Sequence, residues 1–78
     1  MFEIIDMRVA PDDVNVSVSP SLSESLHEVF REVKGLCMTI ASAETGLLID
    51  IGENSNGMPE GEIFRNGKLE RKVFATFS

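Results

Sequence analysis

Residues 19–35 constrain the fold most, because their local signals all agree on one amphipathic helix. Five apolar residues fall within about a third of the helical circle, which is the spacing of a stripe that packs against a core: Leu22, Leu26, Val29, Phe30 and Val33. Ser19-Pro20 and the box from Ser21 to Glu24 predict the start of this helix, and Lys34 and Gly35 predict its end.

The predicted helix carries an acidic ladder on the side opposite its apolar stripe. Glu24, Glu28 and Glu32 are spaced four residues apart, so their carboxylates rise in steps of roughly 6 Å. Like charges at this spacing repel one another and do not stabilise the helix. Two interpretations stay open: an ordinary solvated helix face, or a surface that imitates the negative charge of a nucleic acid and binds a basic partner.

Alternating apolar and polar residues predict strands on both sides of the helix. The predicted strands are residues 2–9, 14–19, 36–41, 47–51, 62–65 and 68–77. Residues 10–13 and Asn66-Gly67 predict tight turns, the second a type I′ hairpin. Residues 52–61 contain nearly every loop-forming residue type, which predicts a mobile surface loop.

These elements predict one small α+β domain spanning residues 1–78, in the order ββαββββ. An antiparallel sheet with the amphipathic helix packed on one face is the arrangement we expect. In the last strand the alternation places Leu69, Val73, Ala75 and Phe77 on one face and Phe74 on the other. Phe74 is therefore expected in a second packed layer, or against a partner or a second copy of the chain.

The charge balance narrows the classes of partner. Thirteen acidic residues against seven Lys and Arg give a net charge of −6, which repels nucleic-acid phosphate and anionic membrane. We therefore expect neither direct nucleic-acid binding nor membrane binding. Four of the seven basic residues lie in the last part of the chain, where they either protect an edge hairpin from aggregation or contact an acidic groove or phosphate: Arg65, Lys68, Arg71 and Lys72.

The chain has a single cysteine, and it does not open with a basic segment followed by an apolar run, as a secretory signal peptide would. Both features favour a cytoplasmic protein. No apolar stretch approaches the roughly 20 residues that span a bilayer.

His27 is interpreted as a surface residue at the edge of the apolar stripe, and Cys37 as a small packed residue. One imidazole and one thiol fall short of a zinc ligand set and lack a third orienting group. We predict no catalytic residue, no cofactor and no metal site.

Sparse catalytic groups and abundant charge predict a non-enzymatic binding protein. The expected partner-binding residues are Glu24, Glu28 and Glu32 on the helix, Glu53 and Glu60 on the loop, and Phe74. In size, acidity and lack of catalytic motifs the chain resembles, in kind, the small inhibitors that phages and mobile elements direct against bacterial defence machinery, including anti-CRISPR proteins. Such an inhibitor occludes a larger protein or nucleoprotein complex with a basic surface.

The alternative is a structural or regulatory subunit, such as a phage assembly component or an antitoxin-like partner. That protein binds by adding its C-terminal strand to a partner sheet, with Phe74 as the anchor.

Overall fold

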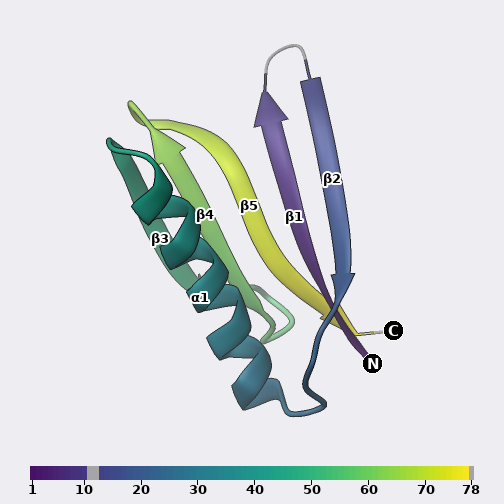
Figure 1. Ribbon diagram of the computed structural model, residues 1–78. Helices are drawn as coiled ribbons and strands as arrows, with labels where there is room; N and C mark the ends of the chain where they lie inside the picture. The colour runs from purple at the N-terminus through teal and green to yellow at the C-terminus, as the bar shows by residue number, and fades with distance from the viewer. Residues whose placement is uncertain (11–12, 78) are drawn as a thin grey trace.

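The chain forms two strands, one helix and three further strands in the computed structural model, which describes residues 1–10 and 13–77 (Figure 1). The elements are β1 (Phe2–Ala10), β2 (Asp13–Pro20), α1 (Leu26–Ala43), β3 (Leu47–Glu53), β4 (Pro59–Arg65) and β5 (Lys68–Phe77). All strands belong to one antiparallel sheet, and α1 packs against β3, β4 and β5. The predicted α+β class, a helix on one face of an antiparallel sheet, is confirmed.

The strand order is β2-β1-β5-β4-β3, so the C-terminal strand lies in the middle of the sheet. It joins the β1–β2 hairpin to the β3–β4 hairpin, and Figure 1 shows the first hairpin turned away from the half of the sheet that α1 covers. The two edges are β2 and β3. The predicted turn at residues 10–13 agrees with the ends of β1 and β2, and its central residues 11–12 lie outside the described residues.

The strand predicted for residues 36–41 is wrong, because α1 continues through Gly35 to Ala43. The backbone at Gly35 is helical, and its carbonyl accepts a hydrogen bond from the Thr39 hydroxyl at 2.9 Å. Cys37 is buried one turn after Val33, so the apolar stripe continues at helical spacing. The alternation of apolar and polar residues over 36–41 therefore does not indicate a strand. The observed order is therefore ββαβββ.

The predicted helix start is also wrong, since α1 begins at Leu26 and its N-cap Ser25 makes no side-chain capping bond. The preceding serines stabilise turns instead. The Ser21 hydroxyl accepts from the Ser23 amide, and the Ser23 hydroxyl accepts from the Ser25 amide, each at 3.1 Å. Serine hydroxyls that bond nearby amides offer the backbone an alternative to helix, which delays the first helical turn.

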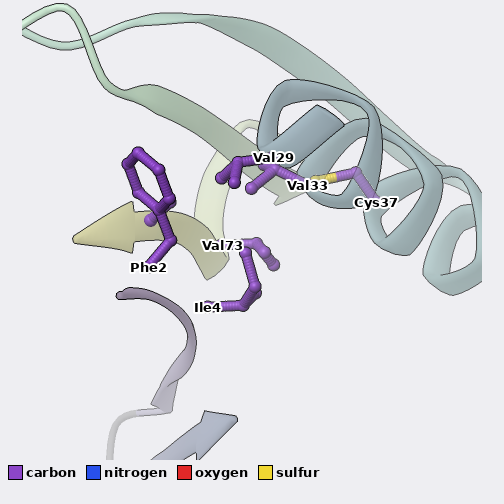
Figure 2. Packing of buried hydrophobic residues seen from close by; sticks show 7 residues of the cluster. Phe2, Ile4, Val29, Val33, Cys37 and Val73 are labelled. Atoms are coloured by element: carbon purple, nitrogen blue, oxygen red, sulfur yellow. The ribbon is translucent and has the colours of Figure 1, made fainter. Parts of the chain in front are cut away.

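The core lies between α1 and the central strands (Figure 2). Its buried members are Val29, Val33 and Cys37 from the helix and Phe2, Ile4, Val73 and Ala75 from the sheet. Val29 and Val33 were predicted members of this core. Leu22 was also predicted there, wrongly: it precedes α1 and is 97% exposed, and Leu26 in the first turn is exposed as well.

Helix and sheet approach closely where Cys37 meets Gly61 of β4. A Cβ added at Gly61 would lie 2.4 Å from the Cys37 Sγ, so only glycine fits at this position without a shift of neighbouring atoms. The thiol is completely buried. The interpretation of Cys37 as a small packed residue is confirmed.

The β4–β5 connection has the conformation that its sequence predicts. Asn66 and Gly67 both have positive φ, 52° and 77°. Positive φ at both central residues is typical of the type I′ turn, whose twist matches that of the flanking strands.

The mobile loop predicted for residues 52–61 is wrong, because both of its ends belong to strands. Only residues 54–58 connect β3 to β4. The Asn54 side-chain oxygen accepts hydrogen bonds from the amides of Asn56 (2.9 Å) and Met58 (3.1 Å), which closes a compact turn.

Candidate partner-binding surface

An apolar cluster covers one half of the sheet face that points away from α1, which we call the outer face. Successive side chains in a strand alternate between faces. Because Val73 and Ala75 are buried under the helix, Phe74 between them lies on the outer face. The register then places Ile5 beside both Phe74 and Val18, and Met7 beside Val16. Val16 and Val18 are 52% and 54% exposed.

Negative charge borders this cluster on β3 and β4. Glu60 lies directly across from Phe74, and Glu62 lies between Asp50 and Lys72. The Lys72 ammonium bonds the Glu60 carboxylate at 3.1 Å. Three carboxylates against one ammonium leave this half of the outer face negative.

A β-bulge extends the apolar character of the outer face toward the β4–β5 turn. The register shifts between Ile63 and Phe64, so Phe64 pairs with Leu69. Leu69 was predicted to share a face with Val73, which is wrong, because the bulge turns it to the outer face. Leu48, paired with Phe64, is 70% exposed. Among residues 1–10 and 13–77, no second layer covers the outer face, since α1 contacts the sheet from the other side.

The three helix glutamates do not form the expected single row. Glu24 precedes α1, and only Glu28 and Glu32 are helical. Glu32 is half-buried, accepts a hydrogen bond from the Ser21 hydroxyl at 2.8 Å, and lines a groove of about 460 Å³ between α1 and β1. Glu28 is exposed and lies 3.9 Å from the Arg31 guanidinium. The two helical glutamates therefore occupy a flank of α1 rather than the side opposite the core.

The other predicted partner-binding residues separate into two places. Glu53 and Glu60, expected on a loop, lie in β3 and β4. Glu53 borders a hollow beside Arg31 and Lys34 on the other flank of α1. Glu60 and Phe74 are cross-strand neighbours on the outer face. Of the predicted site residues, this pair is the one that the fold brings into a common apolar and acidic surface.

The basic residues near the C-terminus are largely paired with carboxylates. Arg71 donates two hydrogen bonds to Asp6, at 2.8 and 2.6 Å. These bonds raise the pKa of the Arg71 guanidinium above its ordinary value. Arg65 bonds both Glu44 and Glu70. Because β5 is central, these residues do not protect an edge hairpin, and that interpretation is wrong.

The central position of β5 is also incompatible with the alternative in which the C-terminal strand adds to the sheet of a partner. Its backbone pairs with β1 on one side and β4 on the other. A partner strand cannot pair with β5 unless one of these neighbours is displaced. Phe74 remains available only through its side chain on the outer face.

His27 and Cys37 lie on the same helix, ten residues apart, which separates them by roughly 15 Å along the axis. His27 is exposed and Cys37 is buried. Burial raises the pKa of the Cys37 thiol, the Asp6 carboxylate raises it further, and Arg71 partly opposes them. The thiol is therefore protonated at neutral pH. In the described part of the chain, no group of three His, Cys, Asp or Glu is placed to hold a metal ion.

The fold and its exposed surface define a small α+β protein with one uncovered, apolar and acidic sheet face. No protein family, curated protein or solved structure matches this chain. Within the described ranges, the single helix falls short of the length and apolarity that crossing a membrane would require.

Proposed function

We propose that this protein is a non-enzymatic binding protein that occludes a basic and partly apolar surface of a larger protein. The outer face of the sheet is the binding surface. The observation that carries this proposal is the adjacency of Phe74 and Glu60 on neighbouring strands, beside Ile5 and Val18. Aromatic residues are enriched in the cores of protein interfaces, and polar groups surround such cores at the rim.

The two halves of the outer face have separate roles in this proposal. Apolar area removed from water contributes about 25 cal/mol per Å², so the cluster around Phe74 provides affinity. The carboxylates of Asp50, Glu60 and Glu62 orient a basic partner and speed its approach. A second copy of the outer face is a poor occupant, because the same carboxylates would meet face to face.

Proteins that handle nucleic acid carry clustered Lys and Arg to bind phosphate, so they present the basic surface that this proposal requires. Occlusion of that surface would inhibit the target. An inhibitor of a host defence or nucleic-acid-handling complex, of the kind that phages and mobile elements encode, is the function that this surface supports best. The net charge of −6 agrees with a partner of the opposite sign.

The test compares charge-matched variants against one purified target. The target is captured from the native host with the wild-type chain as bait, identified by mass spectrometry, and titrated by calorimetry. We expect Asp50→Lys combined with Glu62→Lys to weaken binding strongly, and Phe74→Ser to weaken it through lost apolar burial. In the wild-type complex, the target is expected to lose its binding to a labelled oligonucleotide.

The matched control is Glu24→Lys combined with Glu28→Lys, which changes the net charge equally on a different surface. Both residues are exposed, so the fold is expected to tolerate the change. Binding that survives the outer-face variants but is lost in this control would contradict the proposal and assign the contact to the helix. A target that binds its oligonucleotide equally well in the complex would contradict occlusion.

A further inference from the structure

The edge strand β2 carries the devices that normally prevent edge-to-edge pairing only at its two ends, where Asp13 and Pro20 lie. Residues 15–19 contain no charged side chain, and all are exposed. Natural edge strands are commonly protected by Lys, by inward charges or by a covering element. The opposite edge, β3, carries Asp50 and Glu53. The two edges therefore differ in charge, since Asp13 at the start of β2 is the one charged residue of that strand.

One hydrogen bond fixes which backbone groups of β2 are unpaired. The Ser21 amide donates to the Phe2 carbonyl at 2.8 Å, in continuation of the β1–β2 register. Bonded and non-bonded pairs alternate in an antiparallel ladder. The residues of β2 that bond β1 are therefore the odd-numbered ones. The amides and carbonyls of Val14, Val16 and Val18 point away from β1, and no described strand lies beyond them.

We propose that β2 pairs with β2 of a second copy of this chain, antiparallel across a two-fold axis, to form one continuous sheet. With Val16 on the axis opposite the partner's Val16, Val14 pairs with the partner's Val18. Each bonded pair exchanges two hydrogen bonds, so this register forms about six. Pro20, which has no amide proton, ends the ladder at its outer position.

A second copy is the occupant because the edge is self-complementary. The period of two keeps Val16 and Val18 on the same side in both copies, so apolar side chains meet apolar ones and polar meet polar. The lack of charge along most of this edge is a second argument for pairing between two copies. Two chains with a net charge of −6 repel each other, and residues 14–20, which carry no charge, let their backbones approach with the least repulsion. Dimerisation would also join the two outer faces into one surface.

This proposal goes beyond the binding function, and its test needs no partner protein. The full chain is measured by sedimentation equilibrium over a concentration series, and amide hydrogen exchange is measured at both ends of that series. We expect a dimer at high concentration. The amides of Val16 and Val18 should then gain protection with concentration, whereas those of Ser17 and Ser19 should be protected throughout. This alternation is specific to pairing at the β2 edge.

Val16→Lys places two ammonium groups together at the axis, and we expect it to weaken dimerisation at least about tenfold. The control Leu48→Lys makes the same charge change on the opposite edge and should leave the dimer intact. A monomeric wild type at all concentrations, equal dimerisation of Val16→Lys and the wild type, or a monomer produced by Leu48→Lys would each overturn the proposal. If Val16→Lys fails to fold, the alternating exchange pattern of the wild type decides.

Discussion

At the scale of single residues, Gly61 of β4 and Cys37 of α1 leave no room for a further methyl group between helix and sheet. Gly61→Ala would bring a methyl group within 2.4 Å of the Cys37 Sγ. Overpacking of this kind destabilises by about 1–3 kcal/mol. We expect Gly61→Ala to lower the free energy of unfolding by that amount in urea titrations.

Two further variants make this prediction specific. Gly52→Ala, in the adjacent strand with open space around its Cα, should change stability much less. Cys37→Ala removes the clashing sulfur, so the loss caused by Gly61→Ala should be smaller in the Cys37→Ala background. Equal losses in both backgrounds would show that the sulfur is not the obstacle.

The buried thiol of Cys37 predicts a pH dependence of stability. Burial raises its pKa above the ordinary value of 9.0, so the folded protein binds this proton more tightly than the unfolded chain. The resulting stabilisation is complete below pH 9.0 and is lost as pH rises through the folded pKa. We expect the unfolding free energy of the wild type to fall relative to that of Cys37→Ala above this pH, as measured in urea. Parallel curves for the two proteins would contradict the shift.

At the scale of elements, the helix passes through a residue that normally ends one. Gly35 is exposed, its φ is not positive, and a Cβ there would meet open space. Alanine is about 1 kcal/mol more favourable than glycine inside a helix. We therefore expect Gly35→Ala to raise the free energy of unfolding by about that amount, measured by thermal and urea unfolding followed by circular dichroism.

Whether Gly35→Ala raises or lowers the free energy of unfolding distinguishes a helix that continues through Gly35 from one that ends there. If α1 ended at Gly35 in a left-handed conformation, alanine there would destabilise the protein. Gly46 provides that comparison, because its φ is +84° and Gly46→Ala should lower stability. A loss of stability in both variants would contradict the long helix.

At the scale of the whole molecule, the two proposed associations should respond differently to salt. Capture of a basic partner by the outer face depends on charge attraction, which salt screens over a Debye length of about 10 Å at 0.1 M. Dimerisation through the uncharged residues 14–20 of β2 takes place against the repulsion between two chains of net charge −6. We expect added NaCl to slow association with the partner while leaving dimerisation unchanged or stronger, as followed by stopped-flow and sedimentation. A dimer that dissociates as salt rises would contradict pairing through the uncharged part of β2.

Features decided by near neighbours in the chain were predictable from the sequence. The turn at Asn66-Gly67, the boundaries of β5 and the burial of Val29 and Val33 follow from backbone preference and from the period of apolar residues. The same local signals failed where two elements competed for one segment. The residues after Gly35 alternate like a strand, yet packing of Cys37 against Gly61 favours helix there.

From the residues alone an α+β protein could be predicted, with one amphipathic helix, strands on both sides of it and an excess of acidic charge. The central position of β5, the adjacency of Glu60 and Phe74, and the edge position of β2 became known only from the three-dimensional structure. The physical reason is distance along the chain. Pairing of β1 with β5 joins opposite ends of the sequence, and its free energy comes from shared burial that no local pattern records.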